Sequence, residues 1–381
     1  MSVLRFTRND RPSIGVEIEL QLVDENSFAL RPAIEAVLAK LPEDLHRCVK
    51  PELMQSYLEI NTGVCDTVHD VGQDLSRTLD ALERVTDSEG LKLLWAATHP
   101  FSRWEDQEIT VNDRYFLLVD LMQDVARRLV TFGLHVHIGV DSGDKAVMIC
   151  DRMLRHLPLL LALSSNSPFW NGRHTGLASS RSKIMEDLPT AGLPHQMRNW
   201  SEYVWLINHL MDTGFINTIR EIWWDIRPHH NFGTVEIRVC DVPANLKQVL
   251  ALTALVQCLV TAIDRQIDEG TYFAEYHPMM VQQNKWRATR YGSEAKLVDS
   301  DSYRQRSVED TTRSLIERLS PIADELQCSK ELHWAENLPR ETGSRQQIHI
   351  FESPADIPED QRLRRVVQEM IEQNDWRKFE L

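Results

Sequence analysis

Acidic and imidazole side chains recur at alternate positions in three short segments of the sequence. The pairs are Glu17/Glu19 in SIGVEIELQLV, His135/His137 in GLHVHIGV and Glu236/Arg238 in GTVEIRVCD. Residues two apart on a β-strand project to the same side of the sheet. Apolar residues fill the intervening positions, which predicts that the opposite face of each strand is packed. Each pair alone is also compatible with an ordinary solvated sheet face.

Glu59 lies in a fourth predicted strand, seven residues after Glu52. Carboxylates held a few Å apart on one sheet face repel each other by several kcal/mol, on the order of Coulomb's law at intermediate dielectric, unless protons or cations neutralise them. Divalent ions with oxygen ligands provide this neutralisation, and Mg²⁺ serves where phosphates also bind. Imidazoles among the carboxylates also suit Mn²⁺. The sequence has no HExxH or Cys/His ligand spacing, which disfavours zinc.

Arginines form a second candidate group. Arg227 precedes the GTVEIRVCD segment, Arg181 ends a Ser/Asn/Gly-rich stretch, and Arg287 and Arg290 lie in NKWRATRYG. A guanidinium group donates hydrogen bonds in a fixed fork that matches carboxylate and phosphate oxygens. Arg227 could instead brace a turn, and the last two could be surface charges.

The elements that would position these residues are strands separated by helices. Apolar alternation predicts strands at Ser13–Val23, Met54–Asn61, Gly133–Val140 and Gly233–Asp241. Helical periodicity predicts helices at Pro32–Lys40, Val68–Val85, Val119–Val130, Lys145–Ala162, Trp200–Met211, Leu246–Glu269, Pro321–Asn337 and Arg362–Asn374. This order indicates an α+β fold with a mainly antiparallel sheet, polar on one face and covered by helices on the other. No GxGxxG follows a strand and no GxxxxGK[ST] occurs, which argues against Rossmann and P-loop nucleotide sites.

Composition narrows the class of partner. The chain of 381 residues has 42 Lys+Arg against 57 Asp+Glu, a net charge of −15, which disfavours nucleic acid and anionic membranes. Its six scattered cysteines indicate reduced thiols, and we expect a cytoplasmic protein. The most apolar stretch, Val249–Ile263, is too short to cross a bilayer and predicts a buried helix. The Leu246–Glu269 helix and later helices are candidate surfaces for a homodimer.

Six ordered segments together resemble the carboxylate–amine ligase family, also called type 2 glutamate–cysteine ligase-like, of the glutamine synthetase-like superfamily. The segments are GVEIEL (15–20), EINTG (59–63), GLHVHIGV (133–140), SSNSPFWNGRHTGLASSR (164–181), WWDIRPHHNFGTVEIRVCD (223–241) and NKWRATRYG (284–292). The resemblance implies one catalytic domain over residues 1–381, with 300–381 as a less diagnostic helical part. It also implies a curved sheet that forms a funnel for ATP and amino-acid substrates.

The same resemblance implies roles for individual residues. The metal ligands would be Glu17, Glu19, Glu59, His135 and Glu236, with Glu52 as a weaker candidate, whereas His137 could bind metal or brace its strand. Arg238 and Arg181 would contact the reacting groups, and Arg227, Arg287, Arg290 and Asn166 the nucleotide. The cofactors would be ATP and Mg²⁺, with Mn²⁺ possible. The first substrate would be glutamate, and the second an amine such as cysteine.

The implied reaction is an ATP-dependent amide synthesis. A substrate carboxylate attacks the γ-phosphorus of ATP to give an acyl phosphate, and the amine then displaces phosphate. Two alternatives remain from the residues: a metal-dependent hydrolase or phosphotransferase that uses the same carboxylates, and a non-catalytic nucleotide or amino-acid sensor. The 164–181 segment, with Gly172 and Gly176, could close over the site and exclude water, or could be an ordinary connection.

Overall fold

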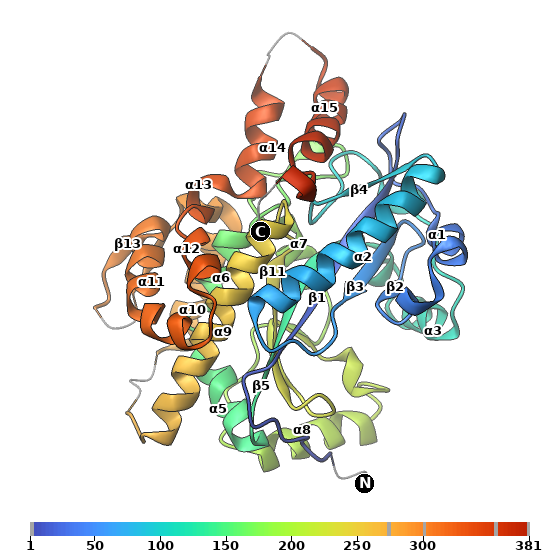
Figure 1. Ribbon diagram of the computed structural model, residues 1–381. Helices are drawn as coiled ribbons and strands as arrows, with labels where there is room; N and C mark the ends of the chain where they lie inside the picture. Colours follow the sequence, from blue (N-terminus) through green and yellow to red (C-terminus); the bar gives the residue numbers. More distant parts are fainter. Residues whose placement is uncertain (1–3, 273–275, 300–301, 354–356, 379–381) are drawn as a thin grey trace.

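A seven-stranded antiparallel sheet runs through the centre of the protein (Figure 1). The computed structural model describes residues 4–272, 276–299, 302–353 and 357–378. The strands follow the order β10-β11-β5-β1-β3-β2, and β4 also pairs with β1. Their bounds are β1 Ile14–Asp24, β2 Val49–Pro51, β3 Tyr57–Asn61, β4 Leu91–Leu94, β5 Gly133–Gly139, β10 Ile226–His229 and β11 Thr234–Asp241. The predicted antiparallel sheet is therefore confirmed.

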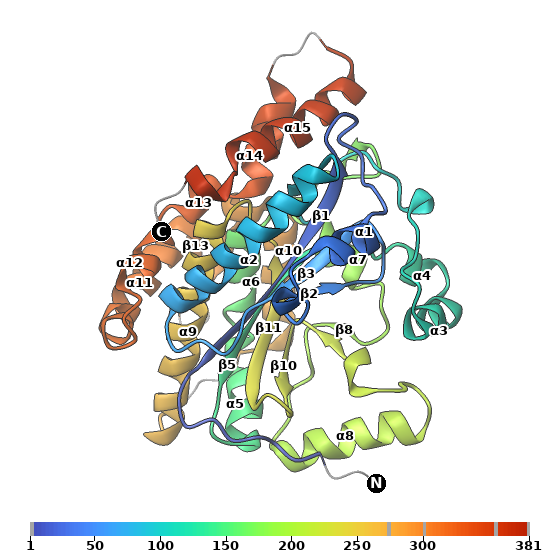
Figure 2. The ribbon, with the colours of Figure 1, turned by 45° about the vertical axis from the view of Figure 1, so that its right-hand side comes forward.

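Helices cover one face of this sheet (Figure 2). The alternate residues Ile14, Val16, Ile18 and Leu20 of β1 are at most 1% exposed, so one side of the strand is packed into the core. Among the helices that contact the sheet, α2 (Val68–Ser88) contacts β1, α5 (Gly143–Met153) contacts β10, α6 (Leu157–Ser164) contacts β11 and α9 (Leu246–Asp268) contacts β5. The period-two pattern thus fixes which side chains of β1 remain for the other, polar face.

Helix α9 is the central helix of the core. It is long and apolar enough to cross a membrane by composition alone, yet 89% of its most apolar stretch is buried inside the protein. Two of its buried polar side chains make hydrogen bonds inside the core: Thr253 Oγ1 donates to Val249 O and Gln257 Nε2 donates to Pro12 O. The predicted buried helix is confirmed.

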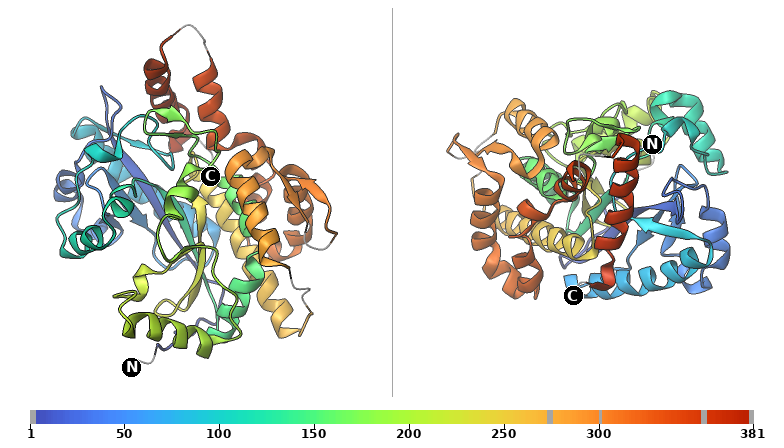
Figure 3. Two further views of the ribbon diagram at one scale, coloured as in Figure 1. Left: turned by 180° about the vertical axis from the view of Figure 1, so that it is seen from behind. Right: turned by 90° about the horizontal axis from the view of Figure 1, so that it is seen from above.

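The remaining elements surround this core (Figure 3). The helices are α1 Ile34–Lys40, α3 Asp113–Met122, α4 Asp124–Arg127, α7 Ser180–Met185, α8 Trp200–Asp212, α10 Pro278–Tyr291, α11 Val308–Glu325, α12 Ser329–Trp334, α13 Leu338–Glu341, α14 Gly343–Glu352 and α15 Glu359–Gln373. Short strands are β6 Phe169–Trp170, β7 Arg173–His174, β8 Ala191–Gly192, β9 Trp223–Trp224, β12 Lys296–Val298 and β13 Gln305–Ser307. Helices α14 and α15 pack against each other and extend beyond one end of the sheet.

Three predicted helices are wrong in extent. The Val119–Val130 helix is interrupted at Gln123, whose φ of 50° lies in the left-handed region. The Lys145–Ala162 helix is two helices, and the second starts with Pro158 in its first turn, where a missing N–H costs nothing. The Pro321–Asn337 helix is two helices: Pro321 lies inside α11, which begins earlier where Ser307 caps it by accepting from Asp310 N, and α12 follows after Gln327, whose φ is 57°.

Candidate active site

The strand register places the predicted acids and imidazoles next to one another on the polar face. Glu17 on β1 lies opposite His135 on β5, and Glu19 lies opposite Glu59 on β3. His137 on β5 lies opposite Glu236 on β11. Directly opposed residues of antiparallel strands have neighbouring side chains on one face. Four strands therefore contribute to a single polar cluster, as the spacing predicts.

Two groups of three ligand atoms within this cluster are close enough to hold a cation. They are Glu17/Glu59/His135 and Glu17/His137/Glu236, each with its ligand atoms within 4.8 Å of one another, and they share Glu17. His135 Nδ1 lies 3.0 Å from Glu17 Oε2, and His137 Nε2 lies 3.4 Å from Glu17 Oε1.

His137 is the ligand that sequence reasoning left open. Its Nδ1 lies 3.0 Å from Thr234 Oγ1, so that hydroxyl orients the ring. Its buried Nε2 has no hydrogen-bond partner among the residues that the structure describes, and it points between Glu17 and Glu236. An unpartnered buried nitrogen between two carboxylates fits a metal ligand oriented by its other ring nitrogen.

Glu19 and Glu52 lie beside the two groups rather than in them. The Glu19 carboxylate accepts a hydrogen bond from Gly133 N at the start of β5. Glu52 follows β2, and the Tyr115 hydroxyl lies 3.5 Å from its Oε2. Burial, and then the charge of Glu19, raises the pKa of Glu52 to about 7. These two acids add negative charge to the cluster without completing either group of three.

The two ends of the cluster differ in electrostatics. Burial and the neighbouring charges of Glu17 and Glu52 raise the pKa of Glu59 well above its ordinary value. At the other end, burial opposes ionisation of Glu236, but Arg227 and Arg238 outweigh it and hold its pKa well below the ordinary value. Burial likewise opposes ionisation of Glu17, whose pKa is lowered overall by the neighbouring imidazoles of His135 and His137.

Arg227 and Arg238 hold Glu236 from two directions. Arg227 Nε donates to Glu236 Oε2 at 2.7 Å, and Arg238 Nη1 donates to Glu236 Oε1. Arg227 is placed by strand register, because β10 pairs it directly with Glu236. The structure thus brings both arginines into the cluster that the acids form.

Arg181 contacts the same strand from a different direction. Its Nη2 lies 3.3 Å from Arg238 O and its Nη1 lies 3.5 Å from Val239 O. In the described part of the chain its buried Nε has no hydrogen-bond partner. Its guanidinium also packs against Gly133, where a Cβ would clash with it. Arg181 therefore lies next to the backbone that carries Arg238.

Asn166, Arg287 and Arg290 are not brought into the cluster. Asn166 is fully buried, and its amide donates to Trp95 O and Val242 O and accepts from Gln347 Nε2. Arg287 is on α10, where its Nη1 donates to Lys296 O. Arg290 is exposed and packs over the ring of its neighbour Tyr291. A nucleotide contact from any of these three stays a prediction.

The first part of the 164–181 segment is fixed rather than free to close over the site. Buried Asp241, at the end of β11, accepts hydrogen bonds from Asn166 N, Ser167 Oγ and Ser179 Oγ. Residues 164–167 are at most 1% exposed. Only the tip around Gly172 and Gly176 is at the surface, so any motion is limited to that tip.

Asp225 and Lys285 are the residues that sequence reasoning missed. They lie 60 residues apart, and Lys285 Nζ donates to Asp225 Oδ2 at 2.5 Å. Both belong to segments that the sequence singled out for their arginines, WWDIRP and NKWRATRYG. A lysine on one face of a helix can be assigned a partner only when the packing of that helix is known.

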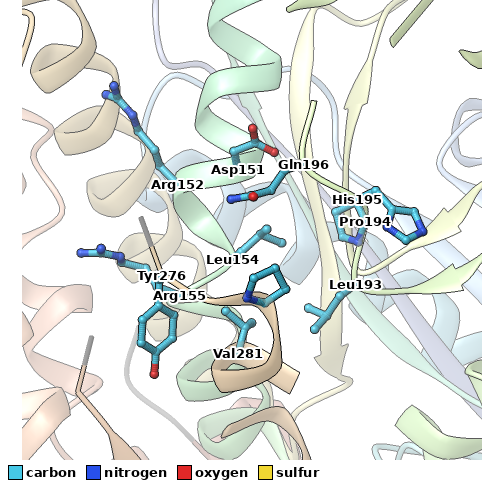
Figure 4. A pocket seen from close by; sticks show the side chains of 11 residues that line it. Asp151, Arg152, Leu154, Arg155, Leu193, Pro194, His195, Gln196, Tyr276 and Val281 are labelled. Carbon is cyan, nitrogen blue, oxygen red and sulfur yellow. The ribbon is translucent and has the colours of Figure 1, made fainter. Parts of the chain in front are cut away.

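The cluster is separate from three cavities in the described part of the chain. One of about 410 Å³ lies between the end of α5, the segment after β8 and the start of α10 (Figure 4). Asp151, His195 and Gln196 are among its lining residues. None of the predicted metal ligands lines these three cavities, and the convergence of the ligands marks the polar sheet face as the candidate site.

Comparisons with known proteins decide the family. The family model described as glutamate-cysteine ligase family 2 matches residues 13–369. The chain belongs to the glutamate–cysteine ligase family 2. A protein of Frankia casuarinae named "Putative glutamate--cysteine ligase 2-1" is 45% identical over 86% of this chain and 87% of its own length. A similarly named protein of Mycolicibacterium smegmatis is 39% identical over 94% and 95%.

Solved structures of low sequence identity share the fold. Glutamate–cysteine ligase from Francisella tularensis, in complex with AMP, has a TM-score of 0.69 at 13% sequence identity. The match covers 98% of this chain and 91% of that chain. A bifunctional glutathione synthetase from Pasteurella multocida also has a TM-score of 0.69, at 15% identity, with 95% of this chain and 52% of that chain covered. The predicted family, fold and ligase class are confirmed, and the hydrolase and sensor alternatives are not favoured.

Proposed function

We propose that this member of the glutamate–cysteine ligase family 2 joins the carboxylate of glutamate to an amine with ATP, on the polar face of the sheet. The observation that carries the proposal is the pair of three-residue groups that share Glu17. Two adjacent cation sites beside two arginines suit a reaction in which a triphosphate and a carboxylate must approach each other. The names of the relatives support glutamate and cysteine as the substrates.

The residues of the cluster fit Mg²⁺ or Mn²⁺. Carboxylate oxygens predominate, which suits a hard divalent ion, and His135 and His137 add the nitrogen ligands that Mn²⁺ accepts. When bound, such an ion neutralises phosphate charge and assists phosphoryl transfer electrostatically. The AMP complex of the Francisella tularensis ligase supports ATP as the nucleotide here.

Arg238 acts, in this proposal, on the oxygens that gain charge during phosphoryl transfer. It is one of two guanidinium groups beside Glu236, and it is held on the polar face. Arg227 keeps Glu236 ionised and oriented. Because both guanidinium groups are fixed by a buried carboxylate, little reorganisation is needed as the negative charge develops.

Arg181 supports the same strand. Its contacts with Arg238 O and Val239 O hold the backbone behind the arginine side chain. The exposed tip around Gly172 and Gly176 is the part of the chain that can cover an acyl phosphate against water. The amine then attacks the acyl carbon, and phosphate leaves.

The cellular setting forms part of the proposal. We propose one catalytic domain, a cytoplasmic location and a homodimer. All six cysteines are buried free thiols, which supports a reducing compartment.

The test is product formation by the purified protein with ATP, Mg²⁺, glutamate and a panel of amines that includes cysteine. We expect phosphate release that requires both glutamate and one amine, and an amide product of the corresponding mass. Phosphate release without any amine would contradict the proposal and would favour the hydrolase alternative. Binding of ATP without any phosphate release would return the sensor alternative.

A further inference from the structure

The NKWRATRYG segment lies on α10, and its buried charge is a lysine. Lys285 is 4% exposed. Its ammonium group lies 2.5 Å from Asp225 Oδ2 and 2.6 Å from Glu186 Oε1. Lys183 contacts the other oxygen of Glu186 at 2.5 Å. Two lysines and two carboxylates therefore alternate in a charge-balanced chain that links α7, α10 and the start of β10.

Asp225 connects this chain to Arg238 through the backbone. Asp225 O accepts from Arg238 N at 2.8 Å, and Asp225 N donates to Gly192 O at 2.8 Å. The side chain of Asp225 is thus held by Lys285, while its two backbone groups join β8 and β11. Arg227, two residues further on, contacts Glu236.

Arg238 needs such support because β11 is irregular at this position. The register between β11 and β5 shifts between Ile237 and Cys240, so that β11 has one residue more than β5 in this stretch. A β-bulge of this kind disrupts the ladder locally and changes the direction of a side chain. On the β5 side the ladder does not fix Arg238. The bond to Asp225 O on the β10 side does.

We propose that Lys285 is a positioning residue that acts through Asp225 to hold Arg238 in its reactive orientation. This inference rests on the proposed function, in which Arg238 contacts the reacting phosphate. Glu186 has a different part, because it anchors Lys285 but has no backbone bond to β11 among the described contacts. A buried ion pair contributes little net stability compared with apolar packing, so a positional role explains better why the pair is placed here.

The matched pair of variants is Asp225→Asn and Glu186→Gln. Each removes one negative charge from Lys285 and leaves the other carboxylate in place. We expect Asp225→Asn to lower kcat about tenfold or more, since small misplacements of a positioned group cost this much. KM for ATP and for glutamate should change less than about twofold, as for loss of an interaction made in the transition state. Glu186→Gln should keep kcat within about threefold.

Hydrogen–deuterium exchange gives a readout that does not depend on activity. The peptide covering residues 234–241 should exchange faster in Asp225→Asn, because the backbone carbonyl that accepts from the Arg238 amide is no longer anchored through the side chain of its residue. In Glu186→Gln the peptide should exchange at the wild-type rate. If the wild type makes no amide, the proposed function fails, while the exchange comparison still decides the positioning role. Equal effects of the two variants on kcat and on exchange would overturn it.

A double variant guards against a misfolded Asp225→Asn protein. Lys285→Met with Asp225→Asn removes both charges of the pair and leaves Lys183 to neutralise Glu186. We expect this variant to fold and to show the same loss of kcat as Asp225→Asn. A folded double variant with wild-type kcat would overturn the proposal.

Discussion

The two ends of the polar cluster solve the problem of buried negative charge in different ways. At the β11 end, Glu236 is 1% exposed and is neutralised by Arg227 and Arg238, which belong to the protein. At the β3 end, Glu59 is also buried, but its nearest cation is Lys50 at 3.9 Å, and its pKa is raised. The charge of Glu236 is therefore neutralised without any bound ligand, whereas ionisation of Glu59 becomes favourable only when a cation binds beside it. We infer that metal binding is controlled mainly at the Glu59 end.

Glu17 joins the two ends, so its removal should have the largest effect. Glu17→Gln removes a charged ligand from both groups of three at once. We expect a loss of about 10³-fold in kcat, a size typical of losing a major electrostatic contribution in an active site. Steady-state kinetics with saturating Mg²⁺ measures it. A loss smaller than that of either Glu59→Gln or Glu236→Gln would contradict the shared role.

Substitutions at the two ends should change stability in opposite directions in metal-free protein. Glu236→Gln leaves Arg227 and Arg238 without their buried counter-ion and should lower the free energy of unfolding by about 3 kcal/mol. Glu59→Gln relieves repulsion and should raise it by about 1 kcal/mol. Urea unfolding in EDTA measures both changes. Changes of the same sign in the two variants would contradict the difference between the Glu236 and Glu59 ends.

The stabilisation by Glu59→Gln should depend on pH. A carboxyl whose pKa is raised in the folded state stays protonated there after it ionises in the unfolded chain. The destabilisation of the folded state by Glu59 is therefore absent below the unfolded pKa of about 4.3, and it grows as pH rises above that value. We expect a larger gain in unfolding free energy at pH 8 than at pH 5 in EDTA. A gain that shrinks as pH rises would show that repulsion is not its cause.

Mg²⁺ should reverse the order of stability between wild type and Glu59→Gln. The wild-type midpoint of thermal unfolding should rise by several degrees at a metal concentration about 100 times Kd, since binding to the folded state then adds about 2.7 kcal/mol. The Glu59→Gln midpoint should rise much less. Calorimetry with and without Mg²⁺ measures the shifts. The buffers contain no Ca²⁺, so that no other divalent ion occupies the carboxylate groups.

The smallest effect is expected at the arginines of α10. Arg290 is exposed and contacts the ring of Tyr291, whereas the side chain of Arg238 is 14% exposed. Arg290→Gln should change kcat and the free energy of unfolding little, kcat by less than about twofold, as for an exposed substitution outside the cluster. A tenfold increase in KM for ATP would show that Arg290 contacts the nucleotide, as the family resemblance implies.

The strands and their polar face could be predicted because a strand has a period of two. The predicted strand Ser13–Val23 is observed as Ile14–Asp24, and Gly233–Asp241 as Thr234–Asp241. Alternation places Glu17 and Glu236 each opposite the packed face of its own strand, which puts them on the same side when the two strands share one sheet. Which strands are neighbours came from the structure.

The helical parts were harder to predict from one sequence. On α10, helical periodicity alone did not show that Lys285 faces inward while Arg287 and Arg290 face outward, because the packing partner of the helix was unknown. The interruption at Gln123 arises from a left-handed residue that carries no clear sequence signal. The sequence therefore identified the site residues that lie on strands, and missed residues such as Lys285 whose partners depend on how a helix packs.

Transfer of oxygen from glutamate to phosphate tests the central claim most directly. With glutamate labelled by ¹⁸O in its side-chain carboxylate, ATP, Mg²⁺ and the accepted amine, attack of the carboxylate on ATP carries one labelled oxygen into the released phosphate. We predict labelled phosphate from the wild type and a rate about 10³-fold lower from Glu17→Gln. Phosphate without label would mean that water attacks ATP directly, and would contradict a ligase centred on the polar sheet face.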